Sequence, residues 1–394
     1  MTSKTTYALA MLASSLIAGT AHAERHVTDT PTEESLSVIP SEQADATSAS
    51  PSESAKQTES ALQQTIESLP EWSKELASRI NLHGYAQAGY TYQSKGAEDD
   101  INTFDLKRIL FFADARITER WSLFFMYDFK RSITHEFYTD YRFTNNKALT
   151  MRLGQFKTSL TYENELSPTS VEAIDVLSEG VAYLAGAGSD PLYGVQYGRD
   201  LGLAIIGETN NGKLAYRVNV LNGQGINKKD GNREKDFIGR IDWRPTSSLT
   251  LIATGQLGRG HAIAPSLYVP EIQVGENYKR DRWSAGFVYN TKGIKLHGEY
   301  LEGRDKDAIS RGAYVTGCVP LTKSLDFVGS YDFFNYNVDR HMDQHKGIAG
   351  IQYWFYKKCR LQLQYVYKNS YIQGGAFHHG ANHAIMGQVQ VRFN

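Results

Sequence analysis

Residues 359–369 read CRLQLQYVYKN, and their side chains alternate between apolar and polar along the run. In an extended strand successive side chains point to opposite faces. One face would carry Leu361, Leu363, Tyr365 and Tyr367. The other would carry Gln362, Gln364 and Lys368. A period of two over about ten residues predicts a β-strand with one apolar face.

The same alternation recurs from Ile80 to Asn394, in segments parted by turn residues. Alternating segments of about ten residues are typical of a transmembrane β-barrel, whose outer face meets lipid and whose inner face meets water. Sixteen strands are predicted: 80–93, 104–117, 120–131, 135–143, 149–156, 199–207, 213–221, 235–244, 248–257, 279–290, 293–303, 310–319, 323–334, 345–356, 359–370 and 381–393. The predicted fold class is therefore all-β, a 16-stranded antiparallel transmembrane barrel spanning 80–394.

The connections between these strands support a barrel over a soluble β-sandwich. Connections after even-numbered strands are short, as at 145–147, 210–212 and 291–292. Many connections after odd-numbered strands are long: 157–198, 222–234, 258–278, 335–344 and 371–380. Membrane barrels have short turns at one rim and long loops at the other. A sandwich has no reason to sort its loops in this way.

Composition excludes other classes. The chain has 394 residues with 42 Lys+Arg and 43 Asp+Glu, so no basic excess points to a nucleic-acid partner. Aromatic residues make up 12 % and Gly numbers 34, which favours strands over helices. Outside the first residues, no apolar run reaches the roughly 18 residues of a membrane-spanning helix.

The N-terminal residues differ from the rest. Residues 1–23 resemble a secretory signal peptide, with Lys4, an apolar stretch and a small-residue Ala21-His22-Ala23 site. Residues 24–79 form an acidic segment, predicted to be disordered apart from a short helix or coiled coil near its end. Such a segment could contact periplasmic components. The only cysteines, Cys318 and Cys359, fall three predicted strands apart and should stay unbonded.

The run 153–160 reads LGQFKTSL and is followed by Tyr162-Glu163-Asn164 and an acidic stretch. It resembles the phosphate-selective porin O and P family, in which a strand ending in such a motif leads into a long third loop. Shorter similar segments are Leu106-Lys107-Arg108 and Asp200-Leu201-Gly202-Leu203. The resemblance implies a trimeric outer-membrane porin of a Gram-negative bacterium, with the third loop folded into the lumen.

A barrel of sixteen strands leaves an open lumen. We expect basic residues to line it: Arg108, Arg116, Lys130, Arg142, Arg152, Lys157, Arg240, Arg244 and Arg282. Acids such as Asp114, Asp140 and Asp242 alternate on the same faces. Rings of one sign would set ion selectivity. This near balance argues against strict selectivity, and solvated wall charges in mutual ion pairs remain the simpler interpretation for most of them.

The connection 157–198 is the candidate constriction loop, because about 40 residues are too many for an idle connection. Its acids include Glu163, Glu165, Glu172, Asp175 and Glu179. Residues 170–185 are predicted to form a helix with Ser170 as its N-cap. We expect the acids to face Arg108, Arg142 and Arg152 across the lumen. An external loop with solvated acids is the alternative.

Histidines gather in two predicted outer loops: His341, His345, His378, His379 and His383. Such clusters can bind a divalent metal, although polar loop tips are the simpler interpretation. No enzyme motif and no cofactor is indicated. The predicted function is passive diffusion of small hydrophilic solutes, leaning toward anions or phosphate, through an outer membrane whose lipid contacts the barrel. The alternatives are an outer-membrane anchor or adhesin, and a lipid hydrolase.

Overall fold

The computed structural model describes residues 70–393 except for 175–176, 191, 193 and 373–378. The predicted signal peptide and most of the acidic segment lie outside the described residues. The described chain begins with helix α3, Glu71–Arg79. Two shorter helices follow, α4 at Tyr162–Glu165 and α5 at Glu179–Leu184. No helix in the described residues is long and apolar enough to cross a membrane.

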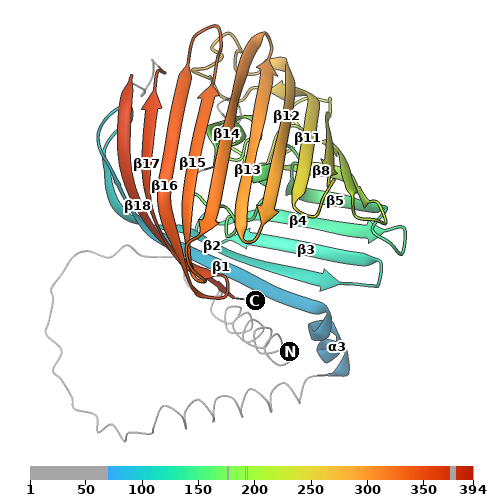
Figure 1. Ribbon diagram of the computed structural model, residues 1–394. Helices are drawn as coiled ribbons and strands as arrows, with labels where there is room; N and C mark the ends of the chain where they lie inside the picture. The colour runs from blue at the N-terminus through green and yellow to red at the C-terminus, as the bar shows by residue number, and fades with distance from the viewer. Residues whose placement is uncertain (1–69, 175–176, 191, 193, 373–378, 394) are drawn as a thin grey trace, which may run out of the picture. The chain divides into compact units, whose positions relative to one another are not determined.

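Most of the described chain forms one closed antiparallel barrel (Figure 1). Its order is β1-β18-β17-β16-β15-β14-β13-β12-β11-β10-β9-β8-β5-β4-β3-β2, sixteen strands within the described residues. Their bounds are β1 Ile80–Gln93, β2 Ile101–Arg116, β3 Trp121–Asp128, β4 Ile133–Arg142, β5 Thr150–Lys157, β8 Arg199–Glu208, β9 Leu214–Leu221, β10 Asp236–Trp243, β11 Leu249–His261, β12 Asn277–Thr291, β13 Ile294–Asp305, β14 Ala308–Pro320, β15 Leu325–Asn335, β16 Asp343–Tyr356, β17 Cys359–Ser370 and β18 Gly380–Phe393. Two-residue strands β6, Ser189–Asp190, and β7, Gly194–Val195, pair separately.

The alternation of side chains sets the two faces of the barrel. On β17, Leu361 and Leu363 point outward and are 48 % and 53 % exposed. Their neighbours Gln362 and Gln364 point inward and are 4 % and 1 % exposed. The outward face is therefore apolar and the inward face is polar, an arrangement typical of transmembrane barrels.

The predicted fold is confirmed, since the sixteen predicted strands match the sixteen observed barrel strands to within four residues at each end. The prediction did not include β6 and β7, which are too short to leave a periodic pattern. Cys318 on β14 and Cys359 on β17 are both buried and free, as predicted.

Candidate functional site

The connection between β5 and β8, residues 158–198, closes at its base. The backbone N–H of Thr158 donates to the Gly198 carbonyl at 2.9 Å. The Asn164 side-chain amide donates to the carbonyls of Thr158 (2.9 Å) and Gly198 (3.1 Å). Gly198 has φ of +65°, and a Cβ there would overlap the Asn164 side chain. The two ends of the loop are thus fastened together, and the residues between them form one excursion from the barrel wall.

The middle of this loop binds the polar inner face of β17. Gln362 and Gln364 each donate a side-chain N–H to the carbonyl of Glu172, at 2.9 and 2.7 Å. The Ile174 backbone N–H donates to Gln364 Oε1 at 2.8 Å, and Arg360 donates to the Val171 carbonyl at 2.7 Å. Buried backbone groups need such partners when they form no regular structure. The inward glutamines therefore hold the loop against the wall.

The side chain of Glu172 joins the loop to β13. Its carboxylate accepts from Lys295 Nζ at 2.6 Å and contacts His297 Nε2 at 3.2 Å. Burial acts to raise the pKa of Glu172, but the hydrogen bond with His297 and the charge of Lys295 lower that pKa to about 2. The residue is therefore ionised and held by two wall side chains at neutral pH.

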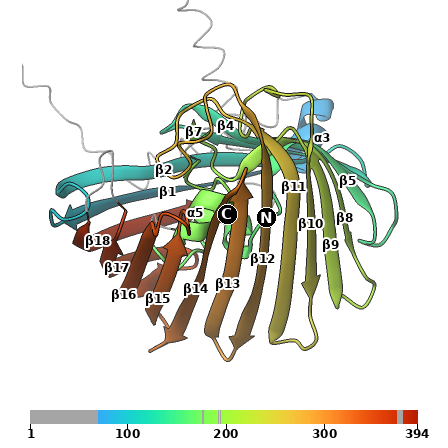
Figure 2. The same cartoon turned by 90° about the horizontal axis from the view of Figure 1, so that it is seen from above.

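Helix α5 packs within the ring of strands, as Figure 2 shows. Glu179 accepts from Lys346 Nζ at 2.9 Å, and the Glu179 backbone N–H donates to Asp332 at 2.6 Å. Burial acts to raise the pKa of Glu179. The positive charges of Lys346 and Lys368 outweigh this effect and lower the pKa to about 2. The apolar side of the helix belongs to one buried cluster with wall residues, namely Val181, Tyr183, Leu184, Leu301 and Phe334.

The predicted helix over 170–185 is wrong for most of its length. Of the described residues in that range only Glu179–Leu184 are helical, and Ser178 rather than Ser170 precedes the helix. The physical reason is that backbone groups near Glu172 and Ile174 bond to wall glutamines instead of to their own chain. Asp175 lies outside the described residues.

A cavity of about 580 Å³ lies between the loop and the inner face of β1–β5, β8, β9 and β18. Seven basic side chains line it: Arg108, Arg131, Arg152, Lys157, Arg199, Arg217 and Arg392. Three acidic side chains line it as well: Glu136, Glu163 and Glu165. The basic groups come almost entirely from the wall, and two of the three acids come from the loop. The cavity therefore has a net basic lining.

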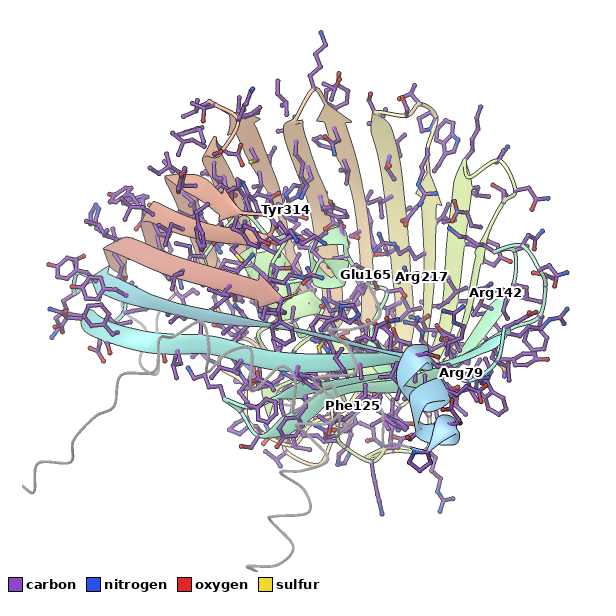
Figure 3. The ribbon with its side chains drawn as sticks, turned by 90° about the horizontal axis from the view of Figure 1, so that it is seen from below. Arg79, Phe125, Arg142, Glu165, Arg217 and Tyr314 are labelled. Atoms are coloured by element: carbon purple, nitrogen blue, oxygen red, sulfur yellow. The ribbon has the colours of Figure 1, made fainter. Side chains whose placement is uncertain are left out.

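Several of these charges are fixed by ion pairs. Arg199 pairs with Glu136 at 2.7 Å, and Arg217 of β9 pairs with Glu165 of the loop. Figure 3 places Glu165 and Arg217 side by side. Arg392 donates to the Thr169 hydroxyl at 3.0 Å and has no carboxylate partner among the described residues. A paired guanidinium keeps a defined position but contributes less net field than an uncompensated one.

Glu163 is an acid of the loop whose charged form is disfavoured by burial. The residue is 5 % exposed, and its carboxylate accepts a hydrogen bond from the Ser178 backbone N–H at 2.8 Å. Burial raises the pKa of Glu163 to about 7, and the negative charges of Glu299 and Asp332 act in the same direction. This residue changes its charge near neutral pH while it lines the cavity.

The structure brings together five of the residues predicted from the sequence: Arg108, Arg152, Lys157, Glu163 and Glu165 all line this cavity. The others lie elsewhere. Arg240 donates to the Thr161 carbonyl at 2.7 Å, and Arg282 pairs with Asp305 at 2.7 Å. Lys130 pairs with Asp105, and Arg244 with Glu208. Arg116 and Arg142 are exposed at strand ends, and Figure 3 shows Arg142 far from Glu165.

Glu163 and Glu165 line the same cavity as Arg108 and Arg152, whereas Arg142 does not line it. Arg152 binds Asp140 through two hydrogen bonds, at 2.8 and 2.9 Å. Arg108 donates to Gln87 at 2.9 Å. The loop acids pair with Arg217, Lys295 and Lys346. Sequence alternation places a side chain on the inner face, but it cannot say which distant strand the loop will reach.

Sequence reasoning did not single out three bases that line the cavity, Arg131, Arg199 and Arg392. Arg392 alternates with the apolar residues of the last strand, so its inward direction was readable from the period. Arg199 is the first residue of β8 and directly follows the long loop. That position in the sequence could have indicated that Arg199 lies near the loop and the cavity. Arg131 lies in a turn, and no periodic pattern marks it.

The histidine clusters do not form a common site in the part of the chain that the structure describes. His345 bonds to the Tyr331 hydroxyl at 2.8 Å, and His383 bonds to the Tyr365 hydroxyl at 2.6 Å, both on the outward face. His341 is exposed, and His379 contacts the ring of Tyr371. His378 lies outside the described residues. No group of three metal-ligating residues is gathered among those described.

Comparison with known proteins gives a likeness of fold. No family model matches the sequence, and no curated protein does. Among solved structures, an anion-selective porin from Comamonas acidovorans matches with a TM-score of 0.58 and 13% identity over 80% of this chain and 99% of that one. The chain has the fold of that porin.

Two further structures agree. OmpF of Salmonella typhi, in complex with daunomycin, matches with a TM-score of 0.57 and 11% identity over 79% of this chain and 97% of that one. OmpT of Vibrio cholerae, an outer membrane protein described in a trimer form, matches with a TM-score of 0.55 and 12% identity over 79% of this chain and 99% of that one. At these identities the likeness concerns the fold.

Proposed function

We propose that this protein is an outer-membrane porin, a passive diffusion channel for small hydrophilic solutes that favours anions. The closed barrel with an apolar outer face and a polar inner face supports a membrane channel. Its likeness to an anion-selective porin supports a Gram-negative outer membrane as its location. The likeness to a trimeric outer membrane protein supports a homotrimer.

The observation that carries the anion preference is the lining of the cavity of about 580 Å³, with seven basic and three acidic side chains. In a passage bounded by protein the effective dielectric falls, and each charge acts more strongly on a passing ion than it does in water. Rings or arcs of one sign set selectivity in such passages. The loop 158–198 narrows the lumen beside this arc and acts as the constriction.

The resemblance of residues 153–160 to the phosphate-selective porin family suggests phosphate as one solute. The ion pairs of Arg152, Arg199 and Arg217 argue for a leaning rather than a strict preference, because each guanidinium already has a carboxylate beside it. Arg392, with a hydroxyl as its partner, contributes a positive charge that no carboxylate of the described residues pairs with.

Planar-bilayer recording of the purified protein in asymmetric KCl tests this function. The reversal potential should show chloride to be more permeant than potassium. Arg392→Gln should move the reversal potential toward zero, since it removes a positive charge of the cavity that no carboxylate of the described residues pairs with. Lys279→Gln is the matched control, because Lys279 is 60% exposed on the outward face and pairs with Asp281. A cation-selective wild type, or equal shifts in both variants, would overturn the proposal.

A further inference from the structure

We propose that the cavity binds organic anions with a flat apolar body, such as aryl carboxylates, in preference to compact inorganic anions. This inference rests on the proposed channel function and names the solute class of the same passage. Two features carry it. One is a strip of aromatic rings on the inner wall, and the other is an arginine beside that strip that pairs with no carboxylate of the described residues.

The aromatic strip crosses five neighbouring strands, β1–β5, on the inward face. Its rings are His83, Tyr85, Phe112, Phe124, Tyr138 and Phe156. Centroids of successive rings are 5.3 Å apart for His83 and Phe112, 6.1 Å for Phe112 and Phe124, and 5.0 Å for Phe124 and Tyr138. The inner face of a water-filled barrel is ordinarily polar. A row of neighbouring aromatic rings at such a place indicates a binding surface.

Part of this strip faces the cavity directly. Tyr85, Phe112 and Tyr138 line it, and Leu110 adds an aliphatic side chain between them. From the loop side, Pro168 and Val171 also line it. An apolar body entering the cavity would therefore meet rings on the wall and aliphatic groups on the loop. Ligand sites commonly combine such apolar walls with a few convergent polar groups.

Cationic groups stand at the edge of the strip. Arg392 on β18 lies directly across from Tyr85 on β1 in the strand register. Its guanidinium contacts the Thr169 hydroxyl, so a carboxylate can approach without displacing a protein acid. Arg152 stacks over the Tyr138 ring, 3.7 Å from its centroid, while it binds Asp140. Its planar group thus extends the aromatic surface.

The balance of these groups favours an aryl carboxylate over phosphate. A compact, strongly hydrated anion gains mainly from several convergent donors with free charge. In this cavity Arg131, Arg199 and Arg217 are each paired with an acid. Arg392, whose guanidinium bonds to a hydroxyl beside several rings, suits a monoanion whose remaining atoms are apolar. Burial of its ring supplies the discrimination.

The test compares how benzoate, acetate and inorganic phosphate reduce the current through the wild-type protein at equal ionic strength and pH 7. Benzoate should reduce the current saturably, at about tenfold lower concentration than acetate, because only benzoate buries a ring. Phosphate should behave as acetate does. Equal potency of benzoate and acetate, or greater potency of phosphate, would overturn the inference.

Variants locate the effect. Phe112→Leu should bring the potency of benzoate to within about twofold of the potency of acetate. The reason is that this variant lacks the Phe112 ring on which benzoate is proposed to stack. Phe125→Leu is the matched control, because Phe125 lies on the outward face of β3, opposite Phe137, which is 52 % exposed. The control should keep the tenfold difference. Loss of the difference in both variants would contradict a site at the aromatic strip.

This experiment can fail or succeed independently of the experiment that tests the channel function. The reversal potential in KCl reports ion preference, whereas the ratio of benzoate to acetate potency reports the aromatic strip. If the protein carries no current, the channel proposal fails, and calorimetric titration of benzoate and acetate into the purified protein still measures the ratio. Absence of benzoate binding in that titration would overturn the inference by itself.

Discussion

Glu163 is the residue at which pH should act on the cavity. Burial raises its pKa to about 7, so the side chain is neutral below that pH and charged above it. We predict that chloride preference falls as pH rises from 6 to 8, because a negative charge then appears beside the basic wall. Reversal potentials at each pH measure this. Glu163→Gln should weaken the pH dependence in this range, and an unchanged dependence in the variant would assign it to another group.

Glu172 should control how firmly the loop is held. Its pKa of about 2 lies below the ordinary value, so its stabilising charge is present above about pH 4.5 and is lost as pH falls toward 2. Removing one member of a buried pair costs about 3 kcal/mol. We predict that Glu172→Gln accelerates hydrogen exchange of the Ile174 amide about a hundredfold at neutral pH.

The matched control for Glu172 is Glu234→Gln. Glu234 pairs with Arg259 at 2.8 Å, and both side chains are more than half exposed. Exposed pairs contribute little. The control should leave exchange at Ile174 unchanged, and an equal acceleration in both variants would show that loss of a carboxylate anywhere loosens the protein.

At the residue scale, the sequence could predict which face of the barrel a side chain points to, but not which residue it pairs with. Alternation along β5 and β10 places Arg152 and Arg240 on the polar face, and both are found there. The partner of Glu172 is Lys295, which is 123 residues away. Nothing in a local pattern connects a loop to the strand that it will meet across a barrel, because that contact is set by how the closed sheet places its far side.

At the scale of elements, the loop 158–198 shows where tertiary contacts override local propensity. Its apolar spacing predicts a helix from Ser170, yet only Glu179–Leu184 is helical among the described residues. Near Ile174 the backbone is satisfied by wall side chains. Helical propensity is worth well under 1 kcal/mol per residue. A buried set of side-chain bonds exceeds it, so the wall decides the conformation.

The loop should also limit conductance. Because the Thr158 N–H bonds to the Gly198 carbonyl, a short Gly-Ser linker can replace residues 161–196 and leave the β5–β8 pair closed. We predict that this deletion raises single-channel conductance about twofold or more, since the loop then no longer narrows the passage. Single-channel recording measures it. An unchanged conductance would place the constriction elsewhere on the wall.

At the scale of the whole molecule, the barrel was predictable because two independent regularities agree. The period of two marks each strand, and the parity of connection lengths orders them around one closed sheet. The interior was not predictable in the same way. The aromatic strip depends on which inward positions of β2, β3 and β4 fall side by side, and that follows from register, which pairs Asp114 with Phe124 and Phe124 with Tyr138.

The outward face carries a feature that bears on assembly. A groove of about 480 Å³ crosses β1, β2 and β18, lined mainly by apolar and small residues: Ala88, Gly89, Tyr90, Phe104, Leu106, Gly387 and Val389. Phe104 beside it is 83 % exposed. In a trimer each interface joins two different patches, so a groove of small residues can receive a projecting side chain of the neighbouring subunit. This face is therefore where subunits of the proposed trimer should meet.

We predict that the wild-type protein is a trimer in mild detergent and that Ala88→Trp yields monomers, because the indole fills the groove that a neighbouring subunit would occupy. Native mass spectrometry measures the proportion of each. Ala313→Trp on the outward face of β14 is the control, since Ala313 lies across from Tyr300 and Phe333 and away from the groove. It should remain trimeric. A monomeric wild type would contradict the trimer itself. A trimeric Ala88→Trp beside a trimeric wild type would place the interface on another face, because a Trp side chain is too large to share this groove with a second chain.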